Sequence, residues 1–169
     1  MDFSPNLTPK EIIQLGSFGG IYFNDCNGKI DISSNEFPDD WFEGLEESQY
    51  KSSKYNKRVN YFNIKSGLSQ AEWEEKGWIN NQDPRGWFQW YCRYFLGRRS
   101  EDDQRQIQRW NNFCGEKGRW RNYIYSKIQK RSTTIDDLTF SLAVRQSLLH
   151  WGYMINKDDF EIWKLKNGI

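Results

Sequence analysis

The chain is poor in several residue types that usually build hydrophobic cores and metal sites. Its 169 residues include one histidine, three cysteines and four prolines, and isoleucine, leucine and valine are sparse. No apolar run approaches the roughly 18–20 residues of a membrane-spanning helix, so we expect no membrane contact. The N-terminus MDFSPNLTPK has no basic region followed by an apolar one. This predicts a cytoplasmic or nuclear protein that is not secreted.

The cysteines are too few and too scattered for a disulfide framework. Cys26, Cys92 and Cys114 are odd in number and far apart in the sequence. With His150 they match the composition of a structural zinc site, but no pair has the short spacing that such sites use. Buried thiols are the preferred interpretation, and we expect no metal and no other cofactor.

Aromatic residues take the place of the missing aliphatic ones. They make up 17% of the chain, so Trp, Tyr and Phe must supply much of the core. Each buried Trp or Tyr also brings a polar tip that needs a hydrogen-bond partner. The length fits one globular domain spanning residues 1–169.

The net charge of +1 hides a strong asymmetry along the chain. Residues 84–131 hold twelve Lys or Arg against four acids, whereas residues 1–83 hold eight bases and fourteen acids. A basic block of this kind is typical of an anion-binding surface. The alternative is that the basic block packs against the acidic N-terminal part and is neutralised there.

Helix signals recur along the chain. TPKEIIQLG predicts a short helix with a capping box formed by Thr8 and Glu11, and SQAEWEEKG predicts another with Ser69 and Glu72. Glycine endings and N-terminal cap residues predict four more helices, over residues 83–97, 100–115, 118–131 and 141–152.

The remaining signals favour short strands. Asn27-Gly28 between two extended stretches predicts a β-hairpin, residues 58–64 (RVNYFNI) suit a strand, and residues 153–165 predict a C-terminal hairpin. The expected fold is therefore α+β: a helix-rich single domain with small β-hairpin elements near the N- and C-terminal ends. The glycines of GSFGG, residues 16–20, predict a tight loop or a close backbone approach.

The segment DPRGWFQWYCRYFLGRRSEDDQRQIQRW, residues 83–110, concentrates arginines and aromatic rings. On a helix, the rings cover nearly all sides of residues 84–96, so most of them are expected in the core. The arginines need another explanation, because arginine grips phosphate or carboxylate with two hydrogen bonds and stacks on rings. We expect the helical pair within residues 83–121 to be the centre of the fold and its functional face.

Three segments resemble a family of small tryptophan-rich proteins from fungi, plants or algae and large DNA viruses. They are GSFGGIYF, the arginine-rich segment above and RQSLLHWGY, and the resemblance spans residues 8–153. The family has no assigned activity, so it brings no catalytic residues. It implies that the Arg, Gln and Asp residues of the central segment belong to a shared site.

These patterns predict a nucleic-acid- or nucleotide-phosphate-binding module. Arginines would hold phosphate, and aromatic faces would stack on bases. The predicted binding residues are six arginines with one glutamine and two tryptophans beside them: Arg98, Arg99, Arg105, Arg109, Arg119, Arg121, Gln106, Trp110 and Trp120.

Two other classes of protein stay open. An enzyme with an arginine-lined pocket, acting on a phosphorylated or anionic small molecule, would place Gln106, Asp103 or His150 at the pocket wall. A protein-interaction scaffold would use exposed tryptophans as anchors. Solvent exposure of the tryptophans separates these classes, because buried rings leave only the arginines to act.

Overall fold

The computed structural model describes residues 3–24 and 32–169, and every regular element in this part of the chain is helical. The α-helices are α1 (Pro9–Leu15), α2 (Gln70–Glu75), α3 (Trp87–Phe95), α4 (Asp103–Cys114), α5 (Arg119–Lys130), α6 (Leu142–His150) and α7 (Lys157–Lys166). Between them lie short 3₁₀ helices: η1 (Phe18–Gly20), η2 (Ser34–Glu36), η3 (Asp39–Trp41), η4 (Glu47–Gln49) and η5 (Lys57–Val59). None of the described helices has the length and apolarity that crossing a bilayer requires.

The α+β prediction is wrong, because the described residues contain no strand. The expected C-terminal hairpin is the helix α7, where the Asn156 side chain caps the first turn by accepting a hydrogen bond from the Asp159 amide. This cap and the acids of the first turn stabilise a helix over the alternation that suggested a strand. Residues 58–64 form η5 and turns. The hairpin turn at residues 27–28 lies outside the described residues.

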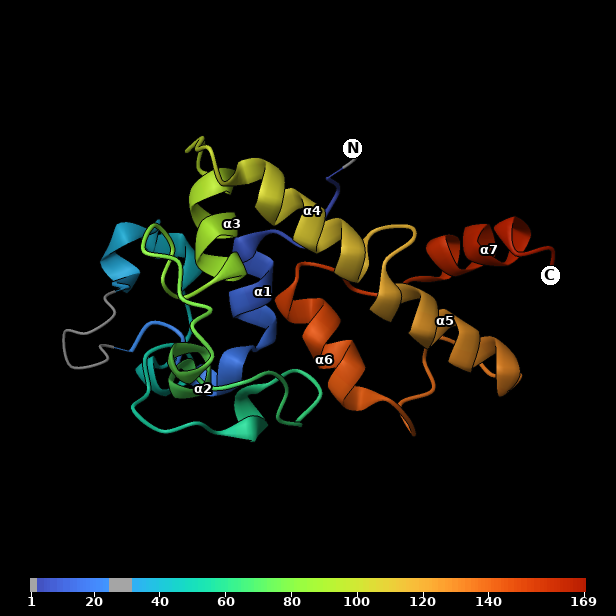
Figure 1. Ribbon diagram of the computed structural model, residues 1–169. Helices are drawn as coiled ribbons and strands as arrows, with labels where there is room; N and C mark the ends of the chain where they lie inside the picture. Colours follow the sequence, from blue (N-terminus) through green and yellow to red (C-terminus); the bar gives the residue numbers. More distant parts are fainter. Residues whose placement is uncertain (1–2, 25–31) are drawn as a thin grey trace.

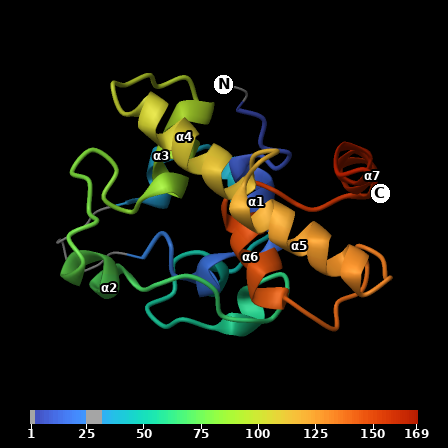
Figure 2. The ribbon, with the colours of Figure 1, turned by 45° about the vertical axis from the view of Figure 1, so that its right-hand side comes forward.

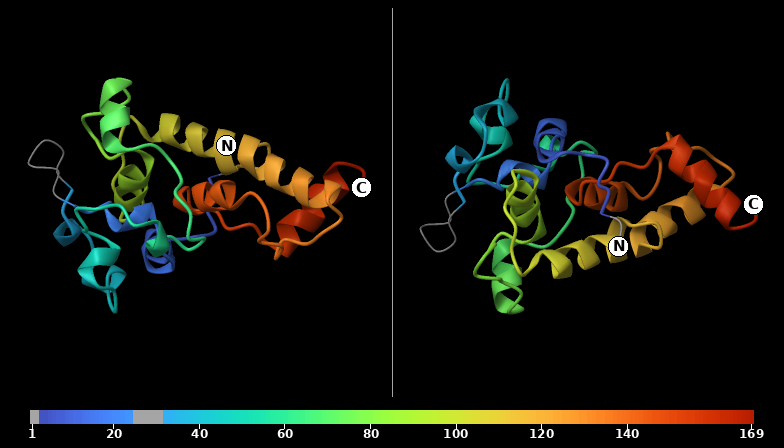
Figure 3. Two further views of the ribbon diagram at one scale, coloured as in Figure 1. Left: turned by 90° about the horizontal axis from the view of Figure 1, so that it is seen from below. Right: turned by 90° about the horizontal axis from the view of Figure 1, so that it is seen from above.

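Helices α4 and α5 run one after the other along one side of the molecule (Figure 3). Helix α6 packs beside α5, and α3 contacts α1. Helices α1 and α6 lie below the α4–α5 line in Figure 1, and the N-terminal and C-terminal parts meet where the Leu7 amide donates to the Gly152 carbonyl (3.1 Å) and the Phe18 amide to His150 Nε2 (3.0 Å). The segment with the 3₁₀ helices and α2 lies at the opposite side from α7 (Figure 2).

The predicted capping residues mark the starts of α1 and α2 correctly, but the predicted start of α3 is wrong. Both predicted capping boxes form, Thr8 with Glu11 and Ser69 with Glu72. Helix α3 begins at Trp87 instead of after Asp83, because Gly86 takes a φ of 87° that ends any helical conformation before it. Asp83 is used elsewhere, as the anchor of an ion-pair cluster.

The aromatic rings form the core, as expected. Trp87, Trp90 and Trp110 are at most 3% exposed. Each indole N–H has a partner: Trp90 donates to the Asp103 carboxylate (2.9 Å), Trp110 to the Trp151 carbonyl (2.8 Å) and Trp87 to the Gln106 carbonyl (3.3 Å). These bonds remove the cost of burying the polar tips, and those of Trp87 and Trp90 fix α3 against α4.

The GSFGG loop is the predicted close approach. Gly16 has a φ of 107°, and a Cβ there would lie 2.1 Å from the Val59 carbonyl oxygen. The Tyr61 amide donates to the Gly16 carbonyl at 3.0 Å, so two backbone segments touch where no side chain fits.

Replacing Gly16 by alanine tests this contact against a matched control. Gly97 has nearly the same φ of 102°, with nothing within 4 Å of its Cβ position. Gly97→Ala should lower the free energy of unfolding by about 1–2 kcal/mol through backbone strain alone. Gly16→Ala should cost about 2 kcal/mol more, because the added carbon overlaps a carbonyl. Urea unfolding measures both, and equal losses would contradict the contact.

Candidate functional site

Arg98, the first of the predicted binding arginines, is held by a buried carboxylate. Asp83 is fully buried, and Arg98 grips it with two hydrogen bonds, from Nη1 to Oδ1 (2.8 Å) and from Nη2 to Oδ2 (2.6 Å). Arg93 also donates to Asp83 Oδ1 (2.9 Å) and pairs with Glu36 (2.5 Å). Arg98 is therefore neutralised by the acidic N-terminal part, as the alternative to an anion-binding surface proposed.

A second chain of contacts runs along α4. Arg105 pairs with Asp102 through Nε (2.5 Å) and Nη2 (2.9 Å), and this pair holds the pKa of the Asp102 carboxyl below its usual range. Gln106 is 1% exposed and donates to Asp102 (3.0 Å). The side-chain oxygen Oε1 of Gln106 accepts a hydrogen bond from Arg109 Nη1 (3.0 Å). Arg109 itself pairs with no carboxylate among the described residues.

Arg99 and Arg119 are exposed and lie over aromatic rings. The Arg99 guanidinium is 3.9 Å from the centre of the Tyr94 ring, and Arg119 is 5.0 Å from that of Trp120. Such contacts hold a cation in place without neutralising it. Within the described residues neither arginine has an acidic partner.

The two predicted stacking rings differ in exposure. Trp110 is 1% exposed and buried in the core, so no base reaches its faces in this conformation. Trp120 is partly buried, with its ring centre 6.1 Å from that of Phe113. The predicted strip of arginines therefore lacks an accessible ring at its centre.

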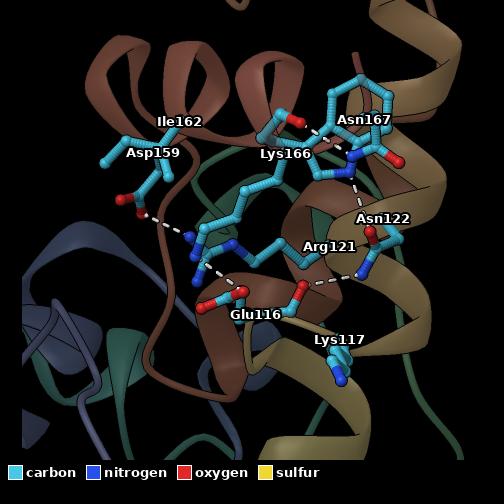
Figure 4. A pocket seen from close by; sticks show the side chains of 9 residues that line it. Glu116, Lys117, Arg121, Asn122, Asp159, Ile162, Lys166 and Asn167 are labelled. Atoms are coloured by element: carbon cyan, nitrogen blue, oxygen red, sulfur yellow. Dashed lines mark hydrogen bonds and ion pairs between the residues drawn. The ribbon is translucent and has the colours of Figure 1, made fainter.

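Arg121 lies in a small cavity between α5 and α7 (Figure 4). It pairs with Asp159 at 3.2 Å, and Asp159 also accepts a hydrogen bond from the Tyr153 hydroxyl (2.6 Å). Across the cavity mouth Lys166 pairs with Glu116 at 2.7 Å. Two of the three cations in the lining are thus paired with its two carboxylates, and Lys117 alone of the described lining cations is left to meet an external anion.

A larger cavity, of about 250 Å³, opens beside α6; we call it the aromatic cavity. Its lining includes seven aromatic residues: Phe18, Tyr22, Tyr55, Trp73, Trp87, Phe88 and Trp151. Trp87 and Trp151 stack with ring centres 4.9 Å apart and planes inclined by 27°. Flat apolar walls with a few polar groups are typical of small-molecule sites.

The described lining of the aromatic cavity includes three basic residues, Lys65, Arg85 and Arg109, and no carboxylate. Arg109 lies 5.4 Å from the centre of the Trp151 ring. Desolvation, reinforced by the nearby Arg105, lowers the pKa of its guanidinium. Lys65 lies 5.7 Å from the centre of the Tyr55 ring. The cavity is therefore positive, whereas the arginines on α4 and α5 outside it are largely paired or on rings.

His150 forms part of the cavity wall at the end of α6. Its Nε2 accepts a hydrogen bond from the Phe18 amide (3.0 Å), and its ring stacks on Phe18 with centres 4.1 Å apart. Burial lowers the pKa of His150 to about 3. At neutral pH the ring is uncharged and the Nε2 lone pair is already bonded, so His150 is not available as a general base there.

Two serine hydroxyls also line the cavity. Ser66 and Ser147 form a short mutual hydrogen bond, and Ser66 also donates to the Ala143 carbonyl (3.1 Å). Their protons are thus used within the protein. His150 is a predicted pocket residue, whereas Ser147 and Trp151 are not predicted from the sequence. Ser147 is three residues before His150 and four before Trp151, a spacing that places the three side chains close together on one turn of helix. Lys65 and Ser66 carry no sequence signal, because they reach the cavity only through the fold.

The residues considered as metal ligands do not come together. Cys92 and Cys114 are buried thiols whose pKa is raised by desolvation, and Cys26 lies outside the described residues. Across residues 3–24 and 32–169, no three His, Cys, Asp or Glu side chains are grouped as metal ligands would be. Asp103, weighed as a pocket-wall residue, accepts hydrogen bonds from Trp90 and Ser100 instead.

Comparison of the chain with protein-family models, with curated proteins and with solved structures found no match in any of the three. The resemblance to a tryptophan-rich family stays a prediction. Any function must therefore be argued from the site itself.

Replacing Asp83 by asparagine tests the ion-pair cluster. Asp83→Asn leaves the Arg93 and Arg98 guanidinium groups without their buried countercharge, so the free energy of unfolding should fall by about 3 kcal/mol. Asp40→Asn is the control, because Asp40 forms an exposed pair with Lys10 (2.8 Å) that should contribute little. Chemical denaturation of both variants measures the difference. If both variants had the same free energy of unfolding, the claim that the ion pairs of Asp83 stabilise the fold would be contradicted.

Proposed function

We propose that the chain binds a small anionic ligand with a flat heterocyclic body, of the nucleoside monophosphate class, in the aromatic cavity. The observation that carries this proposal is the described lining of that cavity, which joins stacked rings with Arg109 and Lys65 and includes no carboxylate. Such a combination favours a ligand that offers a ring face and a negative charge.

The charge of Arg109 supports an anionic ligand. Within the part of the chain that the structure describes, its hydrogen bond is to a neutral group, the Gln106 side-chain oxygen at 3.0 Å. Arg109 is exposed at the cavity and has no carboxylate partner among the described residues, so its charge is available to an incoming phosphate or carboxylate. Gln106 in turn is held by Asp102, which fixes the direction in which the guanidinium points.

The size of the cavity supports a small molecule over a polymer. Its volume of about 250 Å³ lies just below the range of roughly 300–1,000 Å³ typical of small-molecule sites. An extended nucleic acid along α4 and α5 is less well supported, because Arg98, Arg105 and Arg121 already pair with carboxylates and Trp110 is buried. Binding to nucleic acid along this surface is therefore an outcome for the experiment to detect.

The proposal is tested by titrating the protein with the 5′-monophosphates of adenosine, guanosine, cytidine and uridine by calorimetry. We expect at least one to bind, and its nucleoside and inorganic phosphate to bind more weakly. Arg109→Gln should weaken binding by about ten- to a hundredfold, through loss of a charge-assisted contact. Arg119→Gln is the matched control: it removes the same charge from an exposed arginine outside the cavity and should leave binding unchanged.

Two results would contradict this function. One is an absence of binding by all four nucleotides at millimolar concentration. The other is equal weakening by Arg109→Gln and Arg119→Gln, with affinity for single-stranded or duplex nucleic acid that falls steeply with salt. That pattern indicates phosphate contacts spread along the helical surface.

A further inference from the structure

The hydrogen bonds around His150 determine which ring nitrogen carries its proton. Gln146 Oε1 accepts from the Phe62 amide (3.0 Å), which orients the Gln146 amide group and directs its Nε2 to the Gly16 carbonyl (3.2 Å) and to His150 Nε2 (3.0 Å). An amide nitrogen only donates hydrogen bonds. His150 Nε2 therefore faces two donors, Gln146 and the Phe18 amide, and must be the unprotonated nitrogen.

The proton of the neutral ring then lies on Nδ1. No residue of the described chain accepts a hydrogen bond from Nδ1. The atom is nevertheless not fully enclosed by protein. Because His150 is 7% exposed and lines the aromatic cavity, the accessible Nδ1 edge faces that space. A donor is thus fixed at the cavity wall without a protein acceptor.

We infer that His150 recognises the ligand of the aromatic cavity as a neutral hydrogen-bond donor, through Nδ1–H to an uncharged acceptor such as a carbonyl oxygen or a ring nitrogen. The inference rests on the proposed function and adds to it a specificity-determining residue. Arg109 and Lys65 select for charge, whereas His150 selects for an acceptor on the heterocycle. Ser66 and Ser147 complement it, since their protons are used internally and their oxygens are left to accept.

The surroundings of His150 keep this donor constant with pH. The charged groups that line the cavity with it are Lys65, Arg85 and Arg109, all basic, and no carboxylate is found in the described lining. Burial disfavours the imidazolium form. The ring therefore stays neutral across the range in which an ordinary histidine titrates.

The tautomer is measured first, in the free protein. The chain has a single histidine, so a long-range ¹H–¹⁵N correlation spectrum of the ¹⁵N-labelled protein reports this ring alone. We expect the Nδ1–H form, unchanged from pH 5 to pH 8. An Nε2–H form, or a titration midpoint near the ordinary value of about 6.5, would overturn the inference.

The recognition role is measured next, with two variants and the nucleoside monophosphate that binds the wild type most tightly among the four. His150→Gln keeps an acceptor for the Phe18 amide but lacks the Nδ1 donor, so its affinity should fall about five- to tenfold. His150→Asn keeps a donor at the Nδ1 position and should bind within about twofold of wild type. Thermal unfolding of both variants checks that they fold. On adding the nucleotide, the Nδ1–H resonance should also shift.

The outcomes separate this inference from the proposed function. Wild-type binding that depends on Arg109, together with unchanged affinity of His150→Gln and an unmoved Nδ1–H resonance, would overturn the donor role and leave the anion site standing. An absence of wild-type binding would overturn both.

Discussion

The structure depends on one buried carboxylate, that of Asp83. It accepts hydrogen bonds from Arg93 and Arg98, on α3 and on the connection between α3 and α4. A buried charge is tolerated only when it is paired and hydrogen-bonded, so the two arginines and the loop before α3 must keep this arrangement. With Asp83 in place, the rings of α3 face inward and the indole groups of Trp87 and Trp90 reach acceptors on α4.

The same cluster decides where positive charge is available. A basic block of twelve Lys and Arg residues suggests a broad anion-binding surface, yet several of its arginines are paired within the protein. Arg98 pairs with Asp83, Arg105 with Asp102 and Arg121 with Asp159. Arg109 is different, because its partner is a neutral amide and its neighbours are rings. After pairing, Arg109 is left at the aromatic cavity without a carboxylate partner among the described residues, as are Arg99 and Arg119 outside it.

Features set by local chemistry were predictable from the sequence, and features set by tertiary contacts were not. The capping boxes at Thr8 and Ser69, the GSFGG close approach and the burial of the aromatic rings are confirmed. The prediction of a C-terminal hairpin is wrong, because the Asn156 cap favours a helix where apolar alternation suggested a strand. The pairing of Arg98 and Arg121 could not be read from spacing, since Asp83 and Asp159 meet them only after folding, whereas Arg105 pairs with Asp102 three residues before it. The aromatic cavity is formed by segments distant in sequence, including Lys65 and Trp151, so its lining carries no local motif.

The central claim is that an anionic heterocycle binds in the aromatic cavity beside Arg109 and not along the outer face of α4 and α5. Crystals of the protein soaked with 5-bromouridine 5′-monophosphate test it directly, because bromine gives an anomalous signal that marks the base. The account predicts a bromine peak between the rings of the cavity, with the phosphate against Arg109. A peak on the outer surface near Arg99 or Arg119, or no peak at saturating concentration, would contradict it.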